Sequence, residues 1–244
     1  ILGIRYGYAG LARQPLAEPM ELDSGSVASI HEDGGTVLGS SRGGPDAAEM
    51  VDTLERRGVD ILFCVGGDGT LRGAHAIYRE IQERGLRIGV VGVPKTIDND
   101  IPYVYRSFGF QTAVSEAWKV LSCAHVEAKG APNGVGLVKL MGRDAGFVAA
   151  QASRASGDVD FCLIPEIDFP LAGFLQKLQT RLRGHRHAVV AVAEGAGRHL
   201  IGDGGRKDPS GNVVYNDIGL FLKDEIEGHF AGQEQAVSVK YFDP

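Results

Sequence analysis

Residues 61–70 of the chain read ILFCVGGDGT, and the next fifteen or so, LRGAHAIYREIQERG, reach Gly85. The stretch opens with an apolar run of strand length, and the glycines that follow supply a turn. The segment after the turn has helical character and ends at Gly85, a common C-terminal cap. Strand, glycine-rich turn and helix in this order predict the start of a βαβ unit with a parallel sheet.

Four further apolar runs of strand length are continuous rather than alternating, at 88–93, 135–140, 161–164 and 188–193. Such runs are typical of strands buried on both faces of a parallel sheet. We therefore expect an α/β fold. The expected helices span 45–57, 70–84, 111–124, 145–156, 171–183 and 217–230, and 195–212 is expected to be a surface loop.

The composition is that of an ordinary globular protein, with 244 residues, 43% hydrophobic residues and a net charge of −6. Because Lys and Arg are scattered, neither nucleic acid nor an anionic membrane surface is expected as the main partner. No apolar run reaches the roughly 18 residues of a membrane span, and no signal peptide is recognisable. The three cysteines lack metal-ligand spacing, so we expect them to be buried and reduced, as in the cytoplasm.

The glycine-rich turn at 66–69 is suited to binding phosphate. Backbone N–H groups and a helix N-terminus would face the anion, and a side chain at Gly67 or Gly69 would hold it away. Asp68 offers a hard oxygen ligand for Mg²⁺, and Thr70 could cap the helix and donate to phosphate. Taken alone, the motif also fits a plain turn, and a similar motif is found in NAD and lipid kinases.

A second polar segment reads PKTIDND at 94–100 and follows the next predicted strand. A phosphoryl acceptor needs a carboxylate to take its proton, and Asp98 and Asp100 are close enough to share one site. Lys95 and Thr96 add donors for phosphate oxygens. Alone, the segment could be a helix-capping cluster; together with the glycine-rich turn it indicates phosphoryl transfer.

Four motifs in this order resemble those of the phosphofructokinase family: GGDGT at 66–70, PKTIDND at 94–100, MGRDAG at 141–146 and AEGA at 193–196. The resemblance implies an α/β fold of two Rossmann-like lobes with mainly parallel sheets. Residues 1–108 would form the nucleotide and phosphoryl-donor lobe, 109–236 the sugar-phosphate lobe and 237–244 the start of a return to the first lobe. The cleft between the lobes would be the site.

The resemblance also implies roles for single residues. Asp98 matches the general base that removes the proton from the 1-hydroxyl of fructose 6-phosphate, and Asp68 matches the Mg²⁺ ligand. The implied catalytic set is Asp98, Thr96, Asp100 and Arg143. The implied ATP-binding set is Ser41, Arg42, Gly43, Gly67, Asp68, Gly69, Thr70, Gly73 and Lys95. The implied sugar-phosphate set is Thr96, Ile97, Asp98, Met141, Gly142, Arg143 and Glu194.

For three of these residues, a position without a functional role stays open as an alternative. Arg42 and Arg143 could be surface arginines, and Glu194 could be an unspecific acid at the end of a strand. In the family, by resemblance, Arg143 would hold a phosphate or developing charge, and Glu194 would accept hydrogen bonds from sugar hydroxyls.

Two residues bear on the phosphoryl donor. Members that use pyrophosphate usually have Asp at the position of Gly69, where a side chain would occupy the space of the α-phosphate, so Gly69 favours ATP. Lys95 favours pyrophosphate instead, because the pyrophosphate-using members have a Lys at this position that interacts with the short donor. The combination resembles the ATP-using branch of plants and trypanosomatids, so we expect Mg²⁺ and ATP. A pyrophosphate-dependent enzyme and a non-catalytic regulatory paralogue remain the alternatives.

The sequence contains only part of the segments that are typical of the family. The family's first strand and glycine-rich loop would precede Ile1, and its basic residues for the sugar 6-phosphate would follow Pro244. Because there is also no initiating Met, we expect the chain to be incomplete at both ends. Bacterial members lend an arginine across a subunit interface near Gly134, where this chain resembles the plant-like branch. A homo-oligomer, dimer or tetramer, is expected by analogy.

Overall fold

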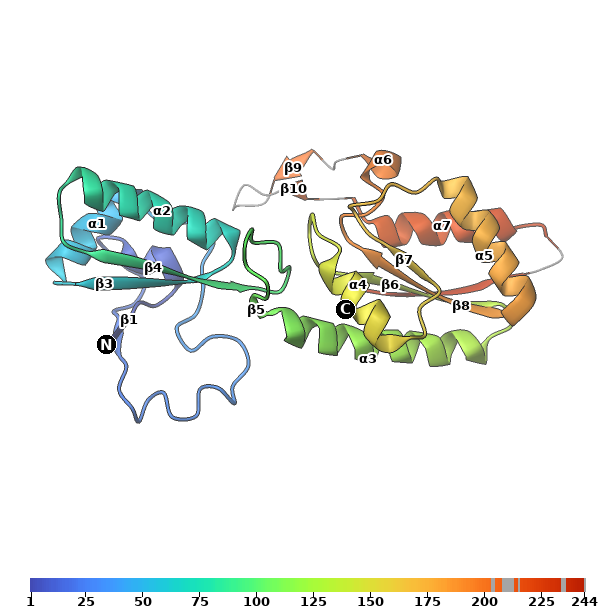
Figure 1. Ribbon diagram of the computed structural model, residues 1–244, viewed down its shortest axis with the longest axis horizontal. Coiled ribbons are helices and arrows are strands. Elements are labelled where there is room, and N and C mark those ends of the chain that lie inside the picture. Colours follow the sequence, from blue (N-terminus) through green and yellow to red (C-terminus); the bar gives the residue numbers. More distant parts are fainter. Residues whose placement is uncertain (203–204, 208–212, 215, 234–235, 244) are drawn as a thin grey trace. The chain divides into compact units, whose positions relative to one another are not determined.

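A computed structural model describes residues 1–202, 205–207, 213–214, 216–233 and 236–243. The chain divides into two compact units (Figure 1): one is formed mainly by Ile1–Pro94, and the other by Lys95–Arg206 with Val213–Pro244. The lobe boundary expected at residue 108 stays a prediction. Residues 108–109 pair with Lys95 and Thr96, which joins the acidic segment to the second unit.

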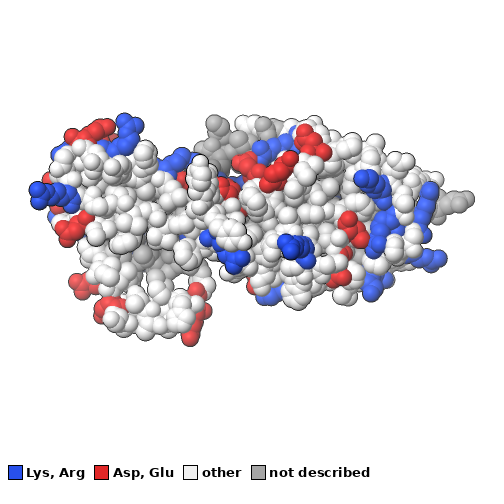
Figure 2. All heavy atoms as spheres, in the orientation of Figure 1, with Lys and Arg blue, Asp and Glu red and all other residues white. Residues whose placement is uncertain are grey.

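Acidic and basic side chains are interspersed on the face shown in Figure 2. Within the described residues, no helix is both long and apolar enough to cross a bilayer. The cysteines are free, and Cys64 is buried as expected. The expectation was wrong for Cys123 and Cys162, which are exposed. Cys123 lies on an outward-facing position of its helix, so helical periodicity and not residue type decides its exposure.

The first unit is built around two parallel strands, β3 and β4. Helices α1 and α2 bury one face of this pair in an apolar cluster that includes Val51, Leu54, Ile77 and Ile81. In chain order its described elements are β1 (Leu2–Gly3), the 3-10 helix η1 (Gly7–Leu11), β2 (Met20–Glu21), α1 (Ala47–Arg56), β3 (Ile61–Gly66), α2 (Asp68–Glu83) and β4 (Gly89–Thr96).

Strand β3 is buried on one face and not on both. Leu62 and Cys64 are buried, whereas Ile61, Phe63 and Val65 are 55%, 63% and 59% exposed. The expectation of a fully buried strand was therefore wrong for β3, because α1 and α2 pack against a single face. It was also wrong for β4, in which no residue is fully buried.

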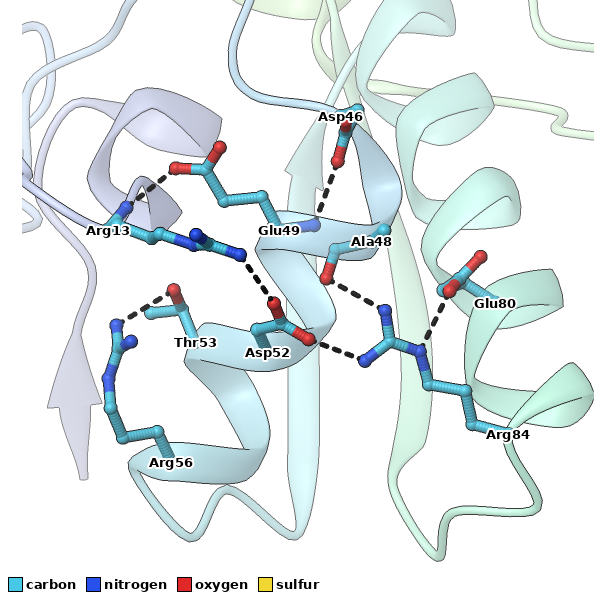
Figure 3. A network of polar contacts seen from close by, with 9 residues as sticks. All are labelled: Arg13, Asp46, Ala48, Glu49, Asp52, Thr53, Arg56, Glu80 and Arg84. Carbon is cyan, nitrogen blue, oxygen red and sulfur yellow. Dashed lines mark hydrogen bonds and ion pairs between the residues drawn. The ribbon is translucent and has the colours of Figure 1, made fainter.

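Helices α1 and α2 are also joined by a polar network (Figure 3). Asp46 caps α1 by accepting from the Glu49 N–H at 2.8 Å. Asp52 accepts from Arg84 at 2.6 Å and from Arg13 at 3.2 Å. These guanidinium groups, Arg84 foremost, hold the pKa of Asp52 below its usual value. Because the network is exposed to solvent, it orients the helices more than it stabilises them.

The second unit contains a parallel sheet of order β11-β6-β8-β7. Helices α3 and α4 cover one face and α5 and α7 the other (Figure 1). Its elements are β5 (Phe108–Gly109), α3 (Phe110–Gly130), β6 (Gly134–Leu140), α4 (Phe147–Ser156), β7 (Phe161–Leu163), α5 (Leu171–His185), β8 (His187–Ala193), α6 (Arg198–Ile201), β9 (Arg206–Lys207), β10 (Val213–Val214), α7 (Ile218–Phe230) and β11 (Ser238–Phe242).

The mixed α/β fold with parallel sheets is confirmed, and β6 and β8 are buried on both faces as expected. Helix α3 continues past the expected end at 124. Ser238–Phe242, expected to begin a return to the first lobe, pairs with β6 in the second unit. The expected loop at 195–212 contains α6 and β9, and its residues 203–204 and 208–212 lie outside the described part.

Candidate active site

The glycine-rich turn lies at the N-terminus of α2, in the first unit. Gly67 is the N-cap residue with extended backbone, and it receives no side-chain cap. Thr70 was expected to cap this helix but lies in its first turn, where its side chain packs against Gly66 so closely that a Cβ there would collide with it. A helix N-terminus without a side-chain cap keeps its first N–H groups available to an anion.

The space beside Gly69 is open. A Cβ at this position would meet only the Arg72 guanidinium, at 3.9 Å. Asp68 is 61% exposed and forms an ion pair with Arg72, four residues on. Arg72 was not singled out from the sequence, although its spacing from Asp68 is that of a helical ion pair.

Asp68 fits the expected Mg²⁺ in chemistry and access. The described residues hold no cluster of three or more His, Cys, Asp or Glu suited to a metal. A cation at Asp68 would therefore need further oxygens from phosphate groups, which is how proteins usually hold Mg²⁺.

The segment 41–43 precedes α1 in the same unit and is exposed. The Ser41 hydroxyl donates to the Tyr6 carbonyl at 2.6 Å. Gly43 has φ +77°, a conformation that favours glycine, and nothing lies within 4 Å of a Cβ placed there. Arg42 is exposed between them.

The acidic segment begins where β4 ends and is a loop fixed by its own hydrogen bonds. Thr96 Oγ1 donates to Asp98 Oδ2 at 3.3 Å and accepts from the Asp98 N–H at 3.2 Å. Asn99 has φ +56°, and its side chain accepts from the N–H of the buried Ser107 at 2.8 Å. Ser107 also donates to the Thr96 carbonyl at 2.8 Å. The sequence offered only the tolerance of Asn for positive φ as a signal of this brace.

Asp98 is the partly buried carboxylate of this loop. Its pKa is raised, first by burial and then by the negative charge of Asp100, with a smaller upward effect of Glu194. The hydrogen bond from Thr96 and the positive charge of Arg143 oppose that rise. The structure therefore brings these five predicted residues together in the second unit. A carboxylate with a raised pKa is a stronger base toward neutral pH.

Arg143 lies in the loop between β6 and α4, which has an unusual backbone. Gly142 has φ +143° and Arg143 has φ +51°. Glu194, which follows β8, accepts from the N–H of Gly142 at 3.1 Å and of Arg143 at 2.8 Å. Gly195 approaches the Arg143 carbonyl so closely that any Cβ would collide with it. Glu194 thus holds the loop that carries Arg143, a contact that the sequence did not reveal.

A second carboxylate holds the far end of the same loop. Glu166, which follows β7, accepts from the N–H of Gly146 at 2.8 Å. Gly146 is the N-cap residue of α4 and has no cap from its own side chain, so Glu166 provides one from a distant segment. Glu166 belongs to none of the recognised motifs, and its place after a predicted strand is the one signal of it in the sequence.

The remaining predicted residues fall into the two units separately. Gly73 lies in α2 in the first unit. The second unit holds Lys95, which is exposed at the end of β4, Ile97, which is partly buried, and Met141, which is 55% exposed. The residues of the implied ATP-binding set thus lie in the first unit, except for Lys95.

The chain matches the family described as Phosphofructokinase over residues 1–240. Over its whole length it is 47% identical to the ATP-dependent 6-phosphofructokinase of Borreliella burgdorferi, to ATP-dependent 6-phosphofructokinase 5, chloroplastic, of Arabidopsis thaliana and to the ATP-dependent 6-phosphofructokinase of Trypanosoma brucei brucei. It covers 57%, 46% and 51% of these proteins, so the chain spans about half the length of the curated relatives it matches. The expected resemblance to plant and trypanosomatid members is confirmed.

Solved structures show the same fold at lower identity. The pyrophosphate-dependent phosphofructokinase of Marinobacter aquaeolei matches with a TM-score of 0.73 at 22% identity, over 98% of this chain and 58% of that one. Pichia pastoris phosphofructokinase in the T-state matches with a TM-score of 0.76 at 21% identity, over 98% of this chain and 26% of that one. With a family match that extends over residues 1–240, the chain belongs to the phosphofructokinase family.

Proposed function

We propose that the protein transfers a phosphoryl group from Mg-ATP to the 1-hydroxyl of fructose 6-phosphate, giving fructose 1,6-bisphosphate. The observation that carries the proposal is the partly buried Asp98, set beside Asp100 and Arg143 with a raised pKa. The similarity of the whole chain to ATP-dependent 6-phosphofructokinases supports the substrate assignment.

Asp98 takes the proton of the acceptor hydroxyl as that oxygen attacks the phosphorus. The bond from Thr96 Oγ1 to Asp98 Oδ2 directs one carboxylate oxygen and leaves the other for the substrate. The guanidinium of Arg143 stabilises charge on the transferring group, and Glu194 keeps the Arg143 backbone in place. Ile97, Met141 and Gly142 complete the proposed sugar-phosphate contacts, which rest on the resemblance to the family.

The donor side uses the N-terminus of α2, where Gly67, Gly69 and Thr70 present backbone N–H groups to phosphate oxygens. Asp68 would hold Mg²⁺, which when bound neutralises charge on the phosphates. We further propose contacts to the donor from Gly73, Lys95 and the segment 41–43. A cytoplasmic homo-oligomer is the proposed state of the protein.

A coupled assay of the full-length protein tests the proposal, with fructose 6-phosphate, Mg²⁺ and either ATP or pyrophosphate. We expect turnover with ATP. Turnover with pyrophosphate alone would favour the alternative donor that the exposed Lys95 suggests. No turnover with either donor would favour a regulatory paralogue and contradict the proposal.

The Asp100→Asn variant is expected to move the acid limb of the kcat–pH profile to lower pH. Activity falls as Asp98 is protonated, and the charge of Asp100 is one cause of the raised pKa of Asp98. Removing that charge therefore lowers the pKa of Asp98. Arg143→Gln removes a charge of the opposite sign and should move the same limb to higher pH. Shifts in the reverse directions would contradict the electrostatic assignment.

Glu194→Ala is expected to lower kcat/KM for fructose 6-phosphate by about tenfold or more, because two loop N–H groups lose their acceptor, at about 1–3 kcal/mol. Glu194→Gln keeps an acceptor oxygen in the same place, so its loss of activity toward fructose 6-phosphate should be smaller. Steady-state kinetics with both variants separates loop positioning from charge. Equal losses in the two variants would show that the carboxylate charge, and not the bond to the loop, is what matters.

A further inference from the structure

The turn at Tyr6–Tyr8 contacts both segments of the first unit that the proposed donor site uses. Tyr6 and Gly7 have φ of 60° and 57°, so the chain reverses sharply between β1 and η1. The turn carries two tyrosines that point to different neighbours. Neither tyrosine belongs to a motif recognisable in the sequence.

Tyr8 is joined to the first turn of α2. Its hydroxyl donates to the Thr70 carbonyl at 2.5 Å. Its ring fills the space beside Gly73, where any Cβ would collide with it. Burial, and then a side-chain hydrogen bond with Cys64 of β3, raise the pKa of Tyr8 above its ordinary value, at which the hydroxyl is already protonated at neutral pH.

The same turn is joined to the segment that precedes α1. The Tyr6 carbonyl accepts from the Ser41 hydroxyl at 2.6 Å, and the Tyr6 N–H donates to the Leu38 carbonyl at 2.8 Å. A Cβ at Gly44 would lie 2.8 Å from the Cβ of Tyr8. The chain on either side of 41–43 is therefore fitted closely around the two tyrosines.

We propose that Tyr8 is a positioning residue for the phosphoryl donor, which fixes the first turn of α2 against the segment 41–43 before the donor binds. This inference rests on the proposed function. Phenylalanine would fill the same space beside Gly73, so packing does not require the hydroxyl. What the hydroxyl adds is an interaction with the Cys64 thiol in β3 and the bond to the Thr70 carbonyl, and the Thr70 carbonyl lies next to the N–H groups that would hold phosphate. Preorganising those groups favours donor binding and has no direct effect on the acceptor.

The test compares Tyr8→Phe with Tyr6→Phe in the full-length protein. Within the described residues the Tyr6 hydroxyl makes one long hydrogen bond, which it accepts from its neighbour Arg5 at 3.5 Å, so Tyr6 is a matched control. One hydrogen bond of this kind contributes about 0.5–1.5 kcal/mol. We therefore expect Tyr8→Phe to raise the KM for Mg-ATP by roughly 3–10-fold with the KM for fructose 6-phosphate unchanged. Tyr6→Phe should change neither constant.

Hydrogen exchange of the backbone amides at 67–73, measured without nucleotide, gives a readout that does not depend on turnover. We expect faster exchange in Tyr8→Phe than in Tyr6→Phe. Exchange and KM values equal to those of the wild type, or an equal rise in both KM values, would overturn the inference. If the wild type turned over with neither donor, the proposed function would fail, and the exchange comparison would still decide whether Tyr8 fixes the turn.

Discussion

Replacing Asp98 by Asn is expected to lower kcat by a factor of about 10²–10⁴ or more, the usual contribution of a positioned general base. Asn keeps the shape of the side chain and an oxygen for the bond from Thr96 Oγ1, so the loop geometry is preserved. What is lost is the ability to take a proton. Steady-state kinetics of the full-length protein with saturating ATP and fructose 6-phosphate measures the loss.

The same variant should not be less stable than the wild type at pH 7. Because the pKa of Asp98 is raised in the folded state, folding disfavours its ionised form. The stability associated with this carboxyl therefore falls as pH rises through its folded pKa, and Asn removes that loss. Thermal unfolding from pH 4 to pH 8 tests the sign: we expect the Tm of the variant to rise relative to that of the wild type as the pH increases.

Asp100→Asn is the matched control for the base. It removes a carboxylate from the same loop without removing the proposed proton acceptor, so it should retain much more activity than Asp98→Asn. Near-normal turnover of Asp98→Asn would contradict the assignment of Asp98 as the general base. If Asp100→Asn lost more activity than Asp98→Asn, the roles of the two acids would be reversed.

The parts of the fold that could be predicted are those that depend on local pattern. The continuous apolar runs correctly indicated β6 and β8, because both faces of these strands are covered by helices. The same reasoning failed for β3, where a continuous run is also compatible with one covered face. The residue types of such a run do not reveal how many layers pack on it.

In the candidate site, too, local sequence motifs predicted some residues but not the contacts that support them. Motifs identified Asp98, Arg143 and Glu194, which the structure brings together in the second unit. The supporting contacts were missed because their partners are far apart in sequence: Tyr8 and Thr70 are separated by 62 positions, and the bond joins a side chain to a backbone carbonyl. A carbonyl acceptor is present at every residue, so no residue type marks the partner.

Gly69→Asp is expected to reduce the use of ATP by on the order of 10³, with the fold retained. The structure makes this a clean test, because a Cβ at Gly69 meets only the Arg72 guanidinium at 3.9 Å, and Gly69 does not have positive φ. The new carboxylate would thus extend into open space where donor phosphates are proposed to bind. Two like charges about 4 Å apart repel by about 4 kcal/mol near a protein surface, which corresponds to roughly a thousandfold in affinity.

Gly69→Asn is the control that separates charge from volume. Asn has nearly the same size as Asp and no charge, so an electrostatic effect should leave it with far more ATP turnover than Gly69→Asp. Equal losses would indicate that space for the α-phosphate decides the donor. Each variant is assayed with ATP and with pyrophosphate, because Lys95 remains exposed in both and is the residue that favours the shorter donor. Unchanged ATP turnover in Gly69→Asp would show that Gly69 gives no reason to assign ATP as the phosphoryl donor. The assignment of the donor would then depend on Lys95.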